Sequence, residues 1–76
     1  MYDLAESYML TSLRLNQELQ NELNQAETSL ELGRLYKETG KIKESKLYFD
    51  SAIKYYKKMK ATHELKNIHN ELTGIL

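Results

Sequence analysis

Cysteine, proline and tryptophan are absent from the 76-residue chain, and only three glycines occur. Without cysteine the chain has neither a disulfide framework nor a thiolate metal site, so its fold depends on a hydrophobic core that is only just sufficient at this length. No apolar run approaches the roughly 20 residues that span a bilayer. Acidic Asp3 and Glu6 stand near the N-terminus, where a secretory signal would carry positive charge. We therefore expect one small domain located in the cytoplasm.

The net charge is zero, but the two halves of the chain differ. Residues 1–38 carry three cations and seven acids, a net charge of −4, whereas residues 39–76 carry eight lysines and four acids, a net charge of +4. A dedicated nucleic-acid-binding domain is normally basic overall. The pattern therefore disfavours nucleic acid as a partner. It favours either solvated helix faces or attraction between the ends of two molecules.

Good helix formers dominate the chain, and no sustained alternation of β-branched and polar residues is present. Apolar residues at helical spacing predict an all-α fold with four helices, over about residues 3–19, 24–38, 42–59 and from 62 onward. Asp3 and Thr62 are the expected N-caps of the first and last helices. Gly40 is expected to adopt the left-handed conformation that ends a helix.

The sequence aligns with itself at an offset of 40 residues. At this offset Tyr8 aligns with Tyr48 and Met9 aligns with Phe49, and size and polarity match at most apolar positions. A fixed period of 20 to 50 residues is typical of repeat architectures. We therefore divide the single domain into a half repeat at residues 1–25, a full repeat at residues 26–59 and a half repeat at residues 60–76.

Two spacings match the tetratricopeptide repeat: L-G-x2-Y at Leu32, Gly33 and Tyr36, and A-x3-F at Ser45 and Phe49. The chain resembles this family, and most closely a longer-period subgroup of about 40 residues in which "LQN" would form the turn between repeats. The resemblance implies antiparallel helical hairpins stacked as a solenoid. It also accounts for Gly33, because a small residue there lets neighbouring helices approach closely, although glycine in a helix costs roughly 1 kcal/mol relative to alanine.

The resemblance implies a protein–protein interaction module that binds a peptide or a partner protein in a concave groove. The first helix of each pair would line this groove, and the implied peptide-binding residues are Glu27, Leu30, Glu31, Arg34, Lys37, Asn67, Asn70 and Glu71. A self-assembling structural scaffold is the alternative, because stable repeat proteins usually need about three repeats and this chain has fewer. The end helices would then associate, with a dimer favoured, through Leu4, Met9, Leu13, Leu72, Ile75 and Leu76.

The sequence offers no pattern typical of catalysis or metal binding. His63 and Glu64 begin an H-E-x-x-H pattern, but Asn67 replaces its second histidine. We expect no enzymatic activity, cofactor or metal. The tract KYYKKMK at residues 54–60 leaves a third alternative, a basic helix that binds nucleic acid or a membrane surface. The preference of lysine for helix C-termini explains the same tract without a ligand, so we disfavour both partners.

Overall fold

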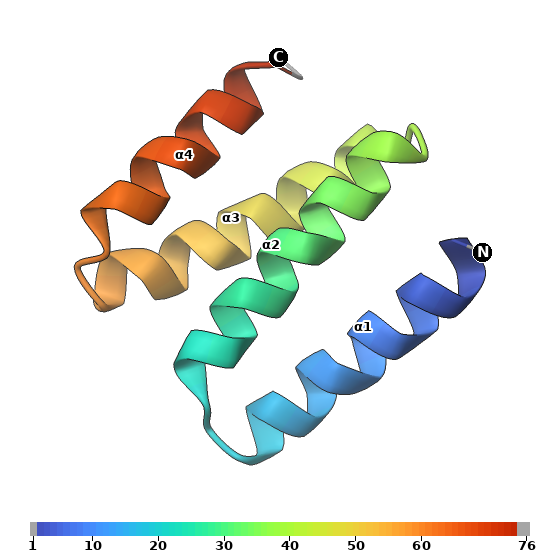
Figure 1. Ribbon diagram of the computed structural model, residues 1–76, viewed down its shortest axis with the longest axis horizontal. Helices are drawn as coiled ribbons and strands as arrows, with labels where there is room; N and C mark the ends of the chain where they lie inside the picture. Colours follow the sequence, from blue (N-terminus) through green and yellow to red (C-terminus); the bar gives the residue numbers. More distant parts are fainter. Residues whose placement is uncertain (1, 75–76) are drawn as a thin grey trace.

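The computed structural model describes residues 2–74, which form four α-helices: α1 (Tyr2–Glu18), α2 (Glu22–Glu38), α3 (Ile42–Lys58) and α4 (Thr62–Thr73). No β-strand occurs within residues 2–74, so the predicted all-α class is confirmed. Successive helices run antiparallel (Figure 1). The most extensive packing is between α2 and α3, with α1 packed on α2 and α4 packed on α3.

The predicted helix boundaries are close, but three of them are wrong. α2 begins at Glu22 rather than near residue 24, because the side chain of Asn21 caps it by accepting a hydrogen bond from the Asn24 backbone N–H at 3.1 Å. Thr62 is not an N-cap but the first residue of α4, and the preceding residue makes no side-chain cap bond. Asp3 lies inside the first turn of α1, which already begins at Tyr2. The proposed division after residue 25 consequently falls inside α2.

Three turns of the same construction join the four helices. In each turn one residue takes a left-handed conformation: Gln20 with φ 56°, Gly40 with φ 81° and Lys60 with φ 57°. The backbone N–H of the next residue then donates to a carbonyl five residues back, at 2.8–2.9 Å in all three turns. This bond pattern satisfies carbonyls that the helix end leaves free. The turns therefore place the helix starts 20 residues apart, which is the origin of the 40-residue offset in the sequence.

Glycine should improve the first and third turns. A left-handed conformation costs a non-glycine residue about 1 kcal/mol, so we expect Gln20→Gly and Lys60→Gly each to raise the free energy of unfolding by about 0.5–1 kcal/mol. Gly40→Ala should lower it by about 1 kcal/mol, although a Cβ at this position would meet no atom within 4 Å. Urea denaturation followed by circular dichroism measures the free energy of unfolding of all three variants and of the parent.

A matched control uses the same change inside a helix. Gln17→Gly on the exposed side of α1 should destabilise by roughly 1 kcal/mol, because glycine is a poor helix former. If Gln20→Gly were as destabilising as Gln17→Gly, the turn residue would not be under strain.

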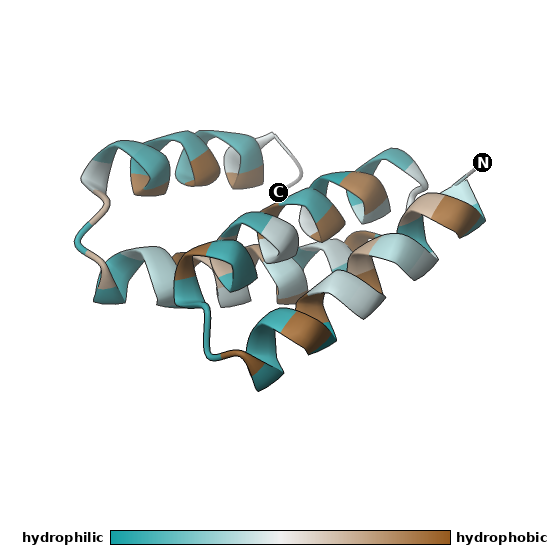
Figure 2. Cartoon of the chain, turned by 60° about the horizontal axis from the view of Figure 1, so that its bottom comes forward, coloured by the Kyte–Doolittle hydropathy of each residue, from teal (hydrophilic) through white to brown (hydrophobic). Residues whose placement is uncertain are grey.

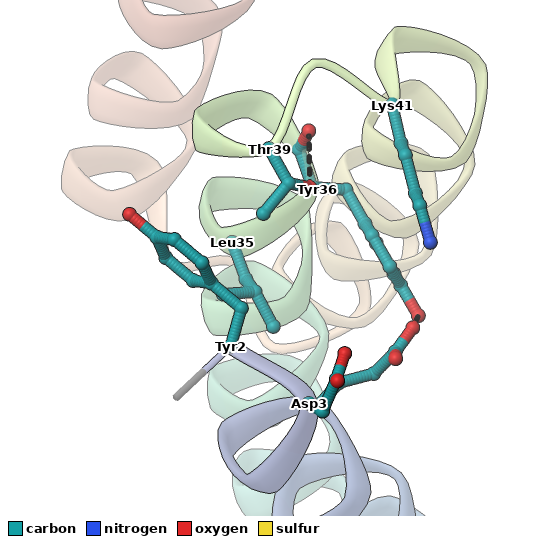
Figure 3. Close-up of a pocket in the computed structure, with 7 residues that line it drawn as sticks. Tyr2, Asp3, Leu35, Tyr36, Thr39 and Lys41 are labelled. Carbon is teal, nitrogen blue, oxygen red and sulfur yellow. Dashed lines mark hydrogen bonds between the residues drawn. The ribbon is translucent and has the colours of Figure 1, made fainter.

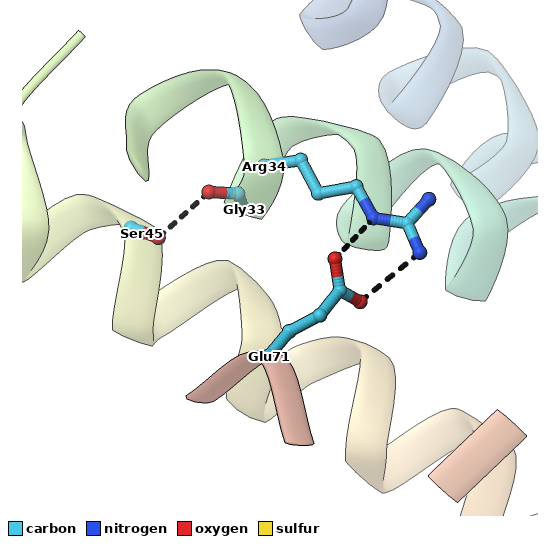
Figure 4. Close-up of polar contacts among 4 residues, drawn as sticks. All are labelled: Gly33, Arg34, Ser45 and Glu71. Carbon is cyan, nitrogen blue, oxygen red and sulfur yellow. Dashed lines mark hydrogen bonds and ion pairs between the residues drawn. The ribbon is translucent and has the colours of Figure 1, made fainter. Parts of the chain in front are cut away.

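The core lies between α2 and α3 and depends on a close approach at Gly33. A Cβ atom at this position would lie 3.1 Å from the ring of Phe49, which is completely buried. Beside this contact, the hydroxyl of buried Ser45 donates a hydrogen bond to the Gly33 carbonyl at 2.6 Å (Figure 4). The buried apolar residues are Ala26, Leu32, Leu35, Tyr36, Phe49, Ala52, Tyr56 and Ile68. The expected close contact at Gly33 is therefore present.

A buried glutamine connects three of the helices. The Gln25 side chain donates to the carbonyl of Asn16 in α1 at 3.1 Å and accepts from the hydroxyl of Tyr55 in α3 at 2.6 Å. Despite this link, none of the residues of α1, Tyr2–Glu18, is buried. Hydrophobic residues nevertheless occur along α1, where the ribbon is coloured brown (Figure 2), and Leu4 among them is 76% exposed. The first helix is thus attached to the core rather than part of it.

A large side chain at position 33 should force α2 and α3 apart. We expect Gly33→Leu to lower the free energy of unfolding by about 1–3 kcal/mol, because overpacking outweighs the better helix propensity of leucine. Asp50→Leu, an exposed position on α3, is the matched control and should change stability by no more than about 0.5 kcal/mol. Thermal circular dichroism of both variants checks this, and a Gly33→Leu protein more stable than its parent would show that the contact is not tight.

Candidate functional site

Two of the predicted groove residues contact each other across α2 and α4. Arg34 on α2 and Glu71 on α4 form a two-bond ion pair, with Nε to Oε1 at 2.7 Å and Nη2 to Oε2 at 3.0 Å (Figure 4). The hydrogen bond that the Arg34 guanidinium donates to Glu71 raises the pKa of that guanidinium further. The two side chains are 50% and 27% exposed, so the pair lies at the surface. Arg34 is thereby held in place rather than free to swing.

Of the remaining predicted peptide-binding residues, only Glu31 lines a pocket together with Arg34 within residues 2–74. Leu30 is half-buried against the core, and Lys37 is half-buried near the end of α4. Asn67 and Asn70 are exposed on α4. The other two predicted residues, Glu27 and Glu31, line the surface of α2 next to α1. The structure therefore divides the predicted set between the two sides of α2.

A continuous groove runs along the junction of α1 and α2. It consists of two adjoining pockets of about 210 and 260 Å³ that share Met9 and Glu31. The first pocket is lined by Tyr8, Met9, Ser12, Asn16, Asn24, Glu27, Thr28 and Glu31, and the second by Met9, Glu31, Arg34, Leu35 and Glu38. Met9 contributes apolar surface to the groove, and α2 contributes three acids beside one cation, Arg34, which is already paired with Glu71. This excess of acid gives the groove the character of a site for a basic, partly apolar segment.

Sequence reasoning missed the α1 side of this groove. It took the groove to be formed by first helices alone and therefore assigned no peptide-binding residue to α1. The 40-residue offset contained the missing signal, because Ser12 and Asn16 align with Ala52 and Tyr56, which lie in the helix contact of α3 with α2.

The residues predicted for self-association have different surroundings. Leu4 is 76% exposed, whereas Met9 and Leu13 are half-buried. Leu72 packs against the core from α4. Ile75 and Leu76 lie outside the described residues. The exposed apolar surface of α1 is larger than predicted, because Tyr8, Leu15 and Leu19 continue the line of Leu4 at 74%, 48% and 75% exposure.

A further pocket of about 250 Å³ lies between the start of α1 and the end of α2 (Figure 3). Its centre is the Tyr36 hydroxyl, which donates a 2.6 Å hydrogen bond to Glu6. The Tyr36 ring stacks on Tyr48 with centroids 5.5 Å apart, and the Lys41 ammonium lies 5.8 Å from the ring centroid. Because Tyr36 and Glu6 already satisfy each other, we assign this pocket to the attachment of α1 rather than to a ligand.

Burial of Tyr36, together with its hydrogen bond to Glu6, raises the pKa of its hydroxyl above the usual value of about 10. Unfolding returns this pKa to its usual value, so the neutral hydroxyl stabilises the fold fully below about pH 10, and the stabilisation is lost as the pH rises above that point. We expect Tyr36→Phe to cost about 1 kcal/mol near neutral pH. In thermal melts, the difference in melting temperature between Tyr36→Phe and the parent should become smaller between pH 9 and pH 11. A difference in melting temperature that stays constant over this pH range would show that Tyr36 keeps its usual pKa in the fold.

The basic tract at the end of α3 is used in packing. Tyr56 is buried, and burial raises the pKa of its hydroxyl. Tyr55 donates to Gln25, and Lys58 pairs with Glu22 at 2.7 Å. The Tyr56 ring is therefore withdrawn from solvent, whereas Tyr55 remains partly exposed.

Residues 2–74 contain two histidines, His63 and His69. Both are exposed on α4, and no cluster of three or more histidine, cysteine or acidic side chains that could hold a metal ion occurs in this range. No described helix is long and apolar enough to cross a membrane.

Comparison with known proteins gives no match to a family model, to a curated protein or to a solved structure.

Proposed function

We propose that the protein is a protein–protein interaction module, built as a stack of helical hairpins in the manner of tetratricopeptide repeats, that binds a segment of a partner protein in the groove between α1 and α2. The equal 20-residue spacing of helices and the three turns of one construction support the stacked arrangement. The observation that carries the function is the groove itself. It joins half-exposed Met9 to exposed Glu27 and Glu31 on a surface that no other part of residues 2–74 covers.

A peptide library tests this proposal. Random peptides of 20 residues displayed on phage are selected against the full chain, and the binders are titrated by calorimetry against the parent protein and two groove variants, Met9→Lys and Glu31→Lys. Since both changes place a cation in an acidic, partly apolar groove, we expect each to weaken the selected binders at least tenfold.

Asp50→Lys is the matched control, because it makes the same reversal of charge at an exposed position on α3. It should leave binding within about twofold of the parent. A selection that yields no binder, or binders that tolerate both groove variants as well as Asp50→Lys, would contradict the proposed function.

A self-assembling scaffold is the second candidate, and the exposed line of α1 favours it. Leu4, Tyr8, Leu15 and Leu19 lie at i, i+4, i+11 and i+15, so they share one face of the helix and its C-terminal extension. Two copies could bury these lines against each other. Light scattering after size exclusion distinguishes the candidates, because self-assembly gives a mass that rises with concentration without a peptide and falls back to the monomer in Leu4→Glu.

A further inference from the structure

α1 presents the same face that α3 uses to hold α2. On α3 this face consists of Ser45, Phe49, Ala52 and Tyr56, which are 0–4% exposed under α2. The residues 40 positions earlier on α1 are Ala5, Met9, Ser12 and Asn16, and all four are only half-buried. The flanking tyrosine shows the same contrast, since Tyr48 stacks on Tyr36 of α2 whereas Tyr8 is 74% exposed. α1 thus has the residues of one side of a helix–helix contact, but no helix within residues 2–74 covers them as α2 covers α3.

The acidic residue beside this face also recurs after 40 positions. Glu71 of α4 pairs with Arg34 of α2, and the residue 40 positions before Glu71 is Glu31. Glu31 is exposed and lines the groove together with Met9. A helix lying on α1 as α2 lies on α3 would bring its own position 34 to Glu31. The acidic balance of residues 1–38, which is −4, favours a cation there.

The last helix of a second copy, α4, fits poorly against this face of α1. α2 approaches α3 with three small residues, Ala26, Ser29 and Gly33, all of them buried. At the same register α4 has Lys66, His69 and Thr73, all of them exposed. Longer side chains at these positions would hold a docked helix away from Met9. This face of α1 therefore favours a docked helix with small residues at these positions, which α4 does not have.

From these observations we infer that the groove takes an amphipathic α-helix of a partner protein, docked on α1 as α2 is docked on α3, with a small residue against Met9 and a cation directly after it that pairs with Glu31. The inference rests on the proposed function and specifies the conformation and chemistry of the bound segment.

The chain supplies its own probe. A fluorescein-labelled peptide with the sequence of residues 22–41 carries the required small residue and cation at its Gly33 and Arg34 positions. It is titrated with the full-length protein, and binding is followed by fluorescence anisotropy. We expect saturable binding with a Kd in the range of about 1–100 µM, because a short peptide also bears the cost of forming a helix. Circular dichroism of the mixture should show more helix than the sum of its parts.

Charge reversal locates the bound peptide. Glu31→Arg should weaken binding at least tenfold, and a peptide carrying Arg34→Glu should restore binding to that variant. A peptide that instead displaced the protein's own α2 would pair with Glu71. Loss of binding to Glu71→Arg without loss of binding to Glu31→Arg would therefore place the peptide on α3. Asp50→Arg, at an exposed position of α3, is the control and should leave binding within about twofold. A peptide carrying Gly33→Leu should bind the parent protein at least tenfold more weakly.

Three outcomes would overturn the inference. The first is no saturation at about 1 mM protein, and the second is equal binding of the Gly33→Leu peptide. The third is sensitivity to Glu71→Arg in place of Glu31→Arg. If groove-dependent peptides from the phage library bound without gaining helix, the proposed function would stand and only the helical partner would be wrong.

Discussion

The missing side chain at Gly33 sets the distance between α2 and α3, and the rest of the molecule follows from that distance. The Phe49 ring occupies the space that a Cβ would take, and the Ser45 hydroxyl reaches the Gly33 carbonyl. Such an approach brings the two backbones together, so the hydrophobic contacts of both helices are made against each other. With no disulfide in the chain, the fold depends on this contact together with Ile68, which α4 adds to the same core.

The turns convert that pairwise contact into a regular arrangement. Each turn ends one helix with the same backbone hydrogen bonds and begins the next helix 20 residues after the previous start. The first and third turns use Gln20 and Lys60 where glycine would be free of strain. Their regular geometry is therefore maintained by the packing of the helices on either side, and only the central turn, at Gly40, is favoured by its own residue.

The sequence predicted the elements of the fold better than it predicted the site. Helical spacing located all four helices, and the Leu32, Gly33 and Tyr36 spacing identified the close contact, because both are local patterns of residue size. The left-handed turns at Gln20 and Lys60 were missed, since neither residue type marks this conformation. Among the predicted groove residues, Arg34 and Glu71 do meet across α2 and α4. The position of Glu27 and Glu31 beside α1 could not be read from the sequence, because whether they face α1 or α4 depends on the rotation of α2. That rotation is set by the buried contacts with α3 and not by any residue of the groove.

The exposure of α1 has a consequence for its dynamics. Since none of residues 2–18 is buried, the separation of α1 from the other helices exposes far less apolar surface than complete unfolding. Opening of α1 then has a lower free energy than global unfolding, and its amide protons exchange with solvent faster than those of α2 and α3. A molecule bound in the groove contacts both α1 and α2, so it stabilises the closed position of α1 and slows that exchange, even at amides it does not touch. Occupation of the groove and the order of the first helix are therefore coupled.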